Sequence, residues 1–387
     1  MASTLAFLVV GASAISCGNS SSTSGGNAKT PVDNTKNLSL SPDGKSATAN
    51  CYIVSEAGAY KFQTVKGNSN ESVGSVVKAE VLWESFGTDE IPSVGDLVRN
   101  ASYNDGYITF QTASTFREGN AVIAAKDAFG KILWSWHIWL TDQPQGQVYY
   151  NNAGTMMDRN LGATSATPGD VCAFGLLYQW GRKDPFLGAS SISKDEDIAA
   201  KSTITWPSTV SSDSRNGTIE YATAHPTTLI TYHGSDYEYS DWHYIADNTR
   251  WTTSDKTKSI YDPCPAGWRV PDGGDNGVWS KALGSSADFD DLSLYDSSNN
   301  GINFSGKFGA ASTIWYPVLG YLEGIVNPDS VEGIQNVGYQ VAYWSASPHS
   351  CCSCYRPRFS FSGDYFKVRP SSPESLARGQ SVRCLQE

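Results

Sequence analysis

The feature that most constrains the fold is the run Ile132–Leu140, in which every second residue is large and apolar. Successive side chains of a strand point to opposite faces, so one face of this run is wholly apolar and suits a sheet packed on a core. His137 and Trp139 would point the other way. They could form an aromatic ligand platform, or a second packed face or inter-domain contact, and we favour the packed face.

Short apolar runs broken by Gly, Asn and Asp continue this pattern through the preceding region. Their spacing of roughly ten residues, with no helical stretch between them, predicts six or seven strands. We therefore expect an all-β antiparallel sandwich at residues 49–143. The clearest runs are residues 51–54, 60–65, 76–83, 107–111, 121–125 and 132–140.

A polar break with Pro and Gly at residues 142–146 is the best candidate for a domain boundary. Beyond it, residues 173–180 and 276–283 have apolar positions at helical spacing, and we expect a short helix at each. Loop-rich strands then follow, which together predict an α+β domain at residues 147–387. The expected strands are residues 316–322, 341–346, 359–361, 366–369 and 381–385.

The N-terminal apolar run at residues 5–15 is too short to span a bilayer but suits the core of a signal peptide. It leads into Ser16-Cys17, which resembles the lipobox of a bacterial lipoprotein, where Cys17 is acylated, for example with palmitate. We expect a lipoprotein signal segment at residues 1–17 and a flexible polar tether at residues 18–48. The first four residues lack Lys and Arg, so either the true start lies upstream or this segment is not a signal.

Charge and composition exclude two classes of protein. The 387 residues carry a formal net charge of -11 and no dense run of Lys and Arg, which argues against a nucleic-acid ligand. Hydrophobic residues make up 40% of the chain and aromatic residues 12%, too much for a disordered polymer. The chain is therefore expected to fold.

Five blocks of sequence occur in order along the C-terminal half. They are DRNLGA at 158–163, GLLYQWGRKDPF at 175–186, DPCPAGWRVP at 262–271, YWSAS at 343–347 and GQSVRC at 379–384. Together they resemble the Fibrobacter succinogenes major paralogous domain, a C-type-lectin-like fold of exported bacterial proteins. The preceding region resembles the sandwich found before this domain in Bacteroides-type surface and fimbria-associated lipoproteins.

The resemblance implies a cell-surface lipoprotein of the outer membrane that acts in adhesion or ligand binding. Its partners would be a glycan, a host or bacterial surface protein, or fimbrial subunits, with the lipid anchor as the contact to the membrane. The lectin-like fold commonly joins the positions of Cys264 and Cys384 by a disulfide, which here would close a loop of about 120 residues. The resemblance carries no catalytic residue.

The other cysteines leave alternatives open. Cys351, Cys352 and Cys354 crowd one loop and, with His349, could form a metal site, although disulfides or free thiols suit this spacing better. Two further cysteines are expected to be buried small hydrophobes or partners of that loop. They are Cys51 and Cys172.

We expect no enzyme and no cofactor, because no standard catalytic motif is present. One alternative is a formylglycine-generating-like oxidase, for which Cys351 and Cys354 are the sole candidate pair for copper. Another is a structural pilus subunit that polymerises by donating a strand.

Polar clusters offer weak candidates for cations. Three histidines lie in one stretch with acidic residues, at His225, His233 and His243, and a solvated loop explains them better than a metal site. The acidic residues at 272–276 and 288–291 lack the spacing of a known calcium loop. No metal site is therefore expected.

If the lectin-like domain has a ligand site, its long loops are the place to look, because loops on a rigid scaffold carry recognition. Aromatic faces beside polar groups commonly hold sugars and peptides. Six residues fit that description, although ordinary core and turn positions explain them as well: Trp315, Tyr316, Tyr321, Glu323, Asn327 and Asp329.

Overall fold

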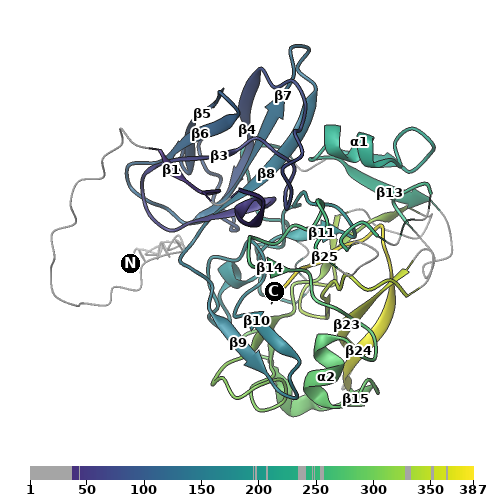
Figure 1. Ribbon diagram of the computed structural model, residues 1–387. Coiled ribbons are helices and arrows are strands. Elements are labelled where there is room, and N and C mark those ends of the chain that lie inside the picture. Colours follow the sequence, from purple (N-terminus) through teal and green to yellow (C-terminus); the bar gives the residue numbers. More distant parts are fainter. Residues whose placement is uncertain are drawn as a thin grey trace, which may run out of the picture.

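The structure is a computed structural model, and most of its described residues outside loops lie in strands. It divides into two parts, which Figure 1 shows one above the other: the sandwich, residues 37–145, and the C-terminal body, residues 146–387. The described residues are 37–42, 44–194, 196, 198–205, 208–233, 241–245, 247, 249–252, 257–326, 333–349, 353–362 and 365–387.

The sandwich consists of two four-stranded sheets. The first has the order β1 (Leu38–Ser39), β3 (Ala59–Gln63), β6 (Tyr107–Thr112), β5 (Val98–Asn104). The second has the order β2 (Cys51–Val54), β8 (Ile132–Leu140), β7 (Gly119–Lys126), β4 (Lys78–Ser85). A 3-10 helix, η1 (Gly44–Ala47), precedes β2.

The predicted sandwich strands are present, but the sheets are not wholly antiparallel. β1 pairs with β3 in parallel, and β2 pairs with β8 in parallel, which places Cys51 opposite His137. Local alternation reports which face of a strand is buried, not which distant strand lies beside it. The run 98–104, which is β5, was missed because only one of its residues is fully buried.

Between the two sheets lies an aromatic core. Trp134, Trp136, Ile138 and Leu140 all contribute to it, so the inward face of β8 is the one predicted by its alternation. The ring of Phe62 lies 5.1 Å from that of Trp136, which joins the two sheets at their centre.

The C-terminal body is built from small sheets and long loops. One sheet has the order β14 (Trp268–Arg269), β26 (Leu385–Gln386), β10 (Gly154–Met157), β9 (Gly146–Tyr149). A second has the order β11 (Leu177–Gln179), β25 (Gly379–Ser381), β19 (Tyr321–Glu323), β21 (Gly333–Gln335). The third is β15 (Phe289–Asp290), β24 (Tyr365–Ser375), β23 (Ser353–Ser362), β22 (Gln340–Ala342).

Two three-stranded sheets complete the body. They are β12 (Thr209–Ser211), β13 (Leu229–His233), β20 (Ile325–Val326), and β16 (Tyr295–Asp296), β17 (Gly301–Asn303), β18 (Trp315–Pro317). Because β10 at the start of the body pairs with β26 near the end of the chain, both ends of the body lie in one sheet.

The helices of the described chain are short. α2 (Val278–Leu283) confirms the helix expected at residues 276–283, and Gly284 ends it in the left-handed conformation. α1 (Ile219–Ala224) was not expected; Thr218 caps it by accepting a hydrogen bond from the Tyr221 amide. Two 3-10 helices, η2 (Val171–Ala173) and η3 (Leu292–Leu294), are also present. No helix in the described residues is long and apolar enough to cross a bilayer.

The helix expected at residues 173–180 is wrong: η2 ends at Ala173 and β11 follows. Gly175 lies between them at a φ of 74°, which ends any helical run. A Cβ at this position would come within 2.7 Å of the Leu161 carbonyl oxygen, so the chain turns where the backbone of another segment packs against it. Apolar spacing alone could not reveal that contact.

The outer face of β8 packs against the C-terminal body. Trp139 is fully buried in a core that also contains Trp180, Trp251 and Trp344 of the body. Its indole nitrogen donates to the Ala163 carbonyl over 3.1 Å. His137 and Trp139 therefore belong to a second packed face, as we favoured, because the sheet that carries them is covered on both sides.

Buried polar groups reinforce this packed junction. The ammonium of Lys183 donates to Asp184 over 2.6 Å and to the Ser135 hydroxyl over 2.7 Å, and Lys183 and Asp184 are both almost fully buried. Asn50 of the sandwich donates to the carbonyls of Ile260 and Asp262. Since buried polar groups need partners, these contacts fix the orientation of the two parts.

Candidate binding cleft

A large cleft of about 1020 Å³ lies where loops of the sandwich meet loops of the C-terminal body. The sandwich contributes Asp89 from the loop after β4, Glu118 directly before β7, and Asp142 soon after β8. The body contributes Arg159, residues 164–172 before and within η2, and residues 190–193, 196 and 198 after β11. The cleft therefore exists only when both parts are folded against each other.

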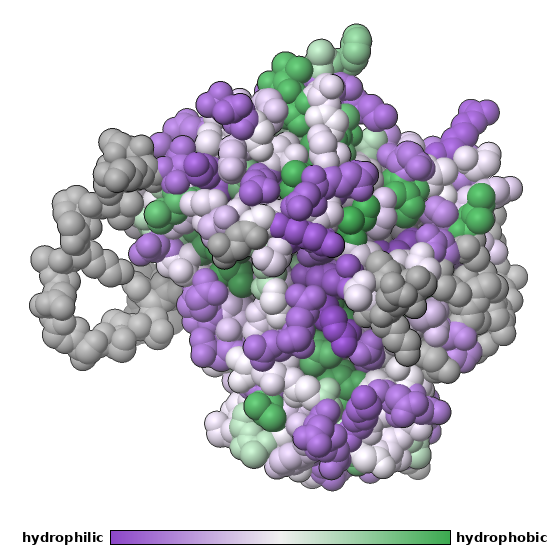
Figure 2. Space-filling model, in the orientation of Figure 1, coloured by the Kyte–Doolittle hydropathy of each residue, from purple (hydrophilic) through white to green (hydrophobic). Residues whose placement is uncertain are grey.

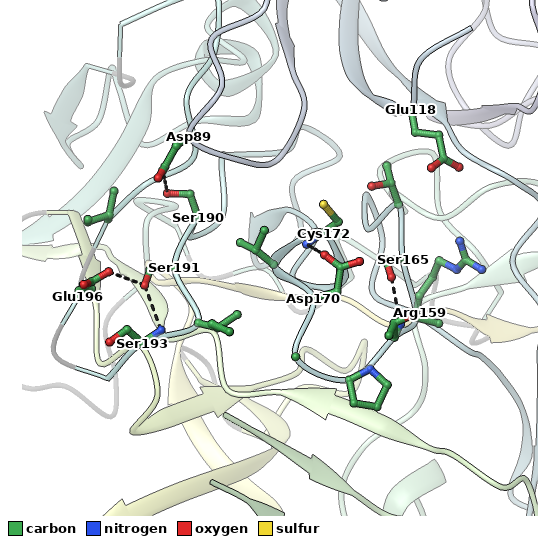
Figure 3. Close-up of a pocket in the computed structure, with 18 of the residues that line it drawn as sticks. Asp89, Glu118, Arg159, Ser165, Asp170, Cys172, Ser190, Ser191, Ser193 and Glu196 are labelled. Atoms are coloured by element: carbon green, nitrogen blue, oxygen red, sulfur yellow. Dashed lines mark hydrogen bonds between the residues drawn. The ribbon is translucent and has the colours of Figure 1, made fainter. Parts of the chain in front are cut away.

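Carboxylates from separate segments surround this cleft, and Figure 3 shows Asp89 and Glu196 on one side of it and Glu118 on the other. The Ser190 hydroxyl donates to Asp89, and the Ser191 hydroxyl donates to Glu196 over 2.7 Å. These bonds to neutral hydroxyls orient the carboxylates without neutralising their charge.

Asp170 lies between these two sides in the same view. Its side chain accepts a hydrogen bond of 2.9 Å from the Cys172 amide and so caps η2. The contact fixes the carboxylate at the cleft wall, and the amide, being neutral, leaves its charge in place.

Glu118 is partly buried at the sandwich side of the cleft. Burial raises the pKa of its carboxyl above the ordinary value, although the hydrogen bond from the Asp142 amide works in the opposite direction. A nearby positive charge would lower this pKa again. The group is therefore sensitive to a cation entering the cleft.

Arg159 is the basic residue among the described residues that line the cleft, and its guanidinium already forms ion pairs within the chain. Its guanidinium pairs with Asp142 at 2.5 Å and with Asp158 at 3.0 Å. Although burial by itself lowers the pKa of Arg159, these two carboxylates raise it, so the group stays charged. Arg159 also lowers the pKa of the Glu118 carboxyl, although burial outweighs this effect.

The wall of the cleft also holds an unused polar group. Thr164 is only 8% exposed, and its hydroxyl has no hydrogen-bond partner within the described structure. Apart from the charged residues and the Ser and Thr hydroxyls, the lining is small or aliphatic, and none of its described residues is aromatic. The hydroxyl oxygen is itself closed to solvent, so a ligand in the cleft does not reach it in this structure.

The residues expected from the sequence to bind a ligand do not lie at this cleft. Trp315, Tyr316, Tyr321 and Glu323 are 3%, 0%, 7% and 6% exposed, so a sugar or peptide cannot reach their faces in this structure. Asn327 and Asp329 lie outside the described residues.

Two arginines, one buried and one partly buried, explain why those aromatic and acidic residues cluster. The guanidinium of Arg383 lies 3.9 Å from the ring centre of Tyr316 and donates to the Trp315 carbonyl. Arg378 lies over Tyr321 and pairs with Glu323 at 3.1 Å. Aromatic and polar side chains here enclose arginines of the same chain.

The cysteine expectations have mixed outcomes. Cys264 and Cys384 form a disulfide across a sequence separation of 120 residues, as the resemblance implied. Cys172 is also disulfide-bonded. Cys51 is a free buried thiol, whose pKa is raised by burial. Cys17 lies outside the described residues, as do Cys351 and Cys352.

Elsewhere, some of the acids that we considered for calcium have basic partners, among them Asp288 with Arg369 at 3.2 Å. Asp272 pairs with Arg269, and Asp291 pairs with Lys307. Within the described residues, no three His, Cys, Asp or Glu side chains are placed to hold a metal ion. His225 stacks on Tyr221 at the end of α1, and most of the stretch that contains His233 lies outside the description.

Sequence reasoning missed the cleft, because its residues come from separate segments without a common motif. The one available signal was that two acids flank predicted strands, Glu118 before β7 and Asp142 after β8. Exposed apolar residues offer no rival site on the face shown in Figure 2, where hydrophobic and hydrophilic residues are intermixed.

A scan against protein-family models finds no matching model, and searches of curated proteins and of solved structures find no match.

Proposed function

We propose that this protein is an exported lipoprotein of the bacterial surface that binds a ligand, in adhesion or as part of a fimbria. The observation that carries the binding role is the open cleft of about 1020 Å³ between its two parts. Recognition sites commonly lie on loops held by a rigid scaffold and at the junction of folded units.

The disulfides support export. The Cys264–Cys384 bond is fully buried, and Cys172 is bonded as well. Such bonds form and persist in oxidising compartments and are rare in the cytosol. Anchoring through acylated Cys17, on a polar tether at residues 18–48, is the matching proposal for the N-terminus.

We further propose that the C-terminal body is a C-type-lectin-like domain of the major paralogous type. The five sequence blocks support this fold, and their residues occupy its core: Trp180, Trp344 and Cys384 all lie in the apolar cluster that packs against β8. A domain that uses these blocks for packing leaves its loops free for recognition.

The anchoring proposal is tested in a bacterial host by mass spectrometry of the mature N-terminus. A diacylated Cys17 in the wild type, and retention of an unacylated chain in Cys17→Ala, would support it. An unprocessed N-terminus in the wild type would contradict it. Protease treatment of intact cells then reports whether the anchored chain is on the outside.

The binding proposal is tested on an array of glycans and of host and bacterial surface proteins. The probe must be the chain from residue 18 onward, because the C-terminal body alone lacks the sandwich side of the cleft. Saturable binding to any class supports the proposal. Binding to none, with fibre assembly instead, would favour the structural pilus subunit.

A further inference from the structure

Asp262 and Pro263 form a buried Asp–Pro peptide bond at the packed junction between the sandwich and the C-terminal body. Both residues are buried, and Asp262 is only 1% exposed. The Asn50 side chain of the sandwich donates to the Asp262 carbonyl oxygen over 2.8 Å. This hydrogen bond polarises the carbonyl and would strengthen if negative charge developed on its oxygen.

The Asp262 carboxyl lies along the same peptide bond. Its Oδ1 accepts a hydrogen bond of 2.8 Å from the Cys264 amide, which folds the side chain forward over the link to Pro263. Its Oδ2 accepts from the Val270 amide over 2.9 Å. Attack of a carboxyl oxygen on the carbonyl carbon of its own residue closes a succinic anhydride ring, and such intramolecular attack gains greatly from proximity.

Burial also shifts this carboxyl toward its protonated state. It raises the pKa of Asp262 from 3.8 to about 6, and the negative charge of Glu387 acts in the same direction. The ammonium of Lys258 and the two amide hydrogen bonds act in the opposite direction. A protonated fraction is therefore present in mildly acidic solution, where an ordinary aspartate is almost fully ionised.

Proline supplies the leaving group. Its nitrogen belongs to a tertiary amide without an N–H, and such a bond breaks more readily than an ordinary peptide bond once the nitrogen is protonated. The Lys258 ammonium holds the turn that follows, because it donates to the carbonyls of Cys264 and Pro265 over 3.0 and 2.9 Å. The nucleophile, the polarised carbonyl and the leaving group thus belong to one fixed turn.

We propose that the chain cleaves its own peptide bond between Asp262 and Pro263. A carboxyl oxygen of Asp262 attacks the Asp262 carbonyl carbon, so that a C–O bond forms and the C–N bond to Pro263 breaks. The carboxyl proton moves to the proline nitrogen. Water then opens the anhydride and leaves Asp262 with two free carboxyl groups. The reaction consumes water, needs no oxidant or reductant, and does not depend on a ligand of the cleft.

A second Asp–Pro bond in the chain serves as an internal control. Asp184, which precedes Pro185, is also buried, but its Oδ1 pairs with the Lys183 ammonium at 2.6 Å and accepts from the Ser135 hydroxyl over 2.5 Å. The ammonium favours the ionised carboxylate, which has no proton to give to the proline nitrogen. The folded chain should therefore stay intact at this bond.

The test follows the full chain by intact-mass spectrometry under reducing conditions, after incubation at about pH 5 and about pH 8. A fragment that ends at Asp262 and one that begins at Pro263 should accumulate at the lower pH, without cleavage after Asp184. Hydroxylamine traps anhydrides, so it should convert part of the new C-terminus at Asp262 into a hydroxamic acid. Fragments that never carry the hydroxamate would indicate a contaminating protease and would overturn the proposal.

The same chain unfolded in guanidinium chloride shows whether the fold accelerates the reaction. In the unfolded chain both Asp–Pro bonds have only their ordinary lability and should break at similar, slow rates. Folding should speed cleavage after Asp262 by about tenfold or more, because the reacting groups are then held together. Equal rates in the folded and unfolded chains would overturn the proposal.

Variants identify the groups that react. Asp262→Asn keeps an acceptor for the Cys264 amide and should slow cleavage by at least about tenfold. Pro263→Ala keeps the carboxyl and worsens the leaving group, so it should also slow cleavage, which tests the reaction even if Asp262→Asn fails to fold. Unchanged cleavage in either folded variant would overturn the proposal.

Asn50→Ala tests the donor to the carbonyl and should slow cleavage by about tenfold or more. The matched control is Asn68→Gly, which removes another side-chain hydrogen bond from the sandwich to the same loop, at the Ser259 carbonyl. Glycine suits its φ of 58°. Equal slowing in both variants would mean that only an intact junction matters, and would overturn the role of Asn50.

Discussion

Two regions lie between the sandwich and the C-terminal body, and they differ in whether their acidic side chains have basic partners. At the packed junction, Lys183 and Asp184 are buried together and share the Ser135 hydroxyl. In the cleft, Asp89 and Glu196 are held by hydroxyls and face the opening without a cation. The difference indicates that the first region holds the parts together, and it leaves the second open, as our proposal of a binding cleft requires.

The largest expected effect comes from Trp139, whose side chain fills the packed junction. Trp139→Ala should lower the free energy of unfolding of the whole chain by about 3–5 kcal/mol, since a fully buried Trp is lost. Phe129→Ala, at a position that is 96% exposed, is the control and should cost under about 0.5 kcal/mol. If urea unfolding gives a similar loss of unfolding free energy for Trp139→Ala and Phe129→Ala, the two parts are not packed together.

The next largest loss of stability is expected at the buried ion pair of Lys183 and Asp184. Lys183→Met leaves Asp184 charged and buried without its cation, which should cost about 3–5 kcal/mol of unfolding free energy. Lys183→Met/Asp184→Leu removes both charges and should recover much of that loss. If the double variant is instead as unstable as the sum of the two single variants, the pair is not coupled and the junction does not depend on it.

Acid should weaken the junction through His137. Burial lowers the pKa of its imidazole from 6.5 to about 3, so below pH 6.5 the unfolded chain takes up a proton that the folded chain does not. Stability therefore falls as the pH drops from about 6.5 to about 3, by up to about 1.4 kcal/mol per pH unit.

The measurement compares unfolding of the wild type and His137→Gln across that window. Asp262 opposes His137, because burial raises its pKa from 3.8 to about 6, and this contribution to stability is lost as the pH rises through that value. It is present in both proteins, so the difference between them isolates His137. An identical pH dependence in the two would contradict the assignment.

The sandwich was more predictable than the C-terminal body for a physical reason. In β8 the local alternation and the final burial agree, because a sheet face is a local property of the strand. The packing of its second face was also foreseeable, since Trp139 is too large and apolar to remain exposed.

The C-terminal body depends more on contacts between distant segments. From the sequence, Trp315 and Tyr316 could form a ligand platform or surround a buried cation. Arg383, whose contact with them decides between these alternatives, lies 68 residues after Trp315. Likewise, Gly175 looked like part of a helix until the Leu161 backbone was seen against it. Such contacts leave no local pattern.

The cleft could not be predicted from the sequence for the same reason. Asp89 and Ser190 are joined across 101 positions of sequence, and only the folded chain brings them together. What the sequence did show was an acidic chain of net charge -11. It could not show that acids collect at one opening while others, such as Asp272, are paired.

One measurement tests the contrast between the two regions most directly: the Tm of the triple variant Asp89→Asn/Glu118→Gln/Glu196→Gln beside that of Lys183→Met. Because the cleft acids form no ion pair with Lys or Arg within the described residues, the triple variant should keep the wild-type Tm or exceed it. Lys183→Met, which leaves Asp184 buried without its cation, should lower the Tm. A similar fall in both variants would contradict the account.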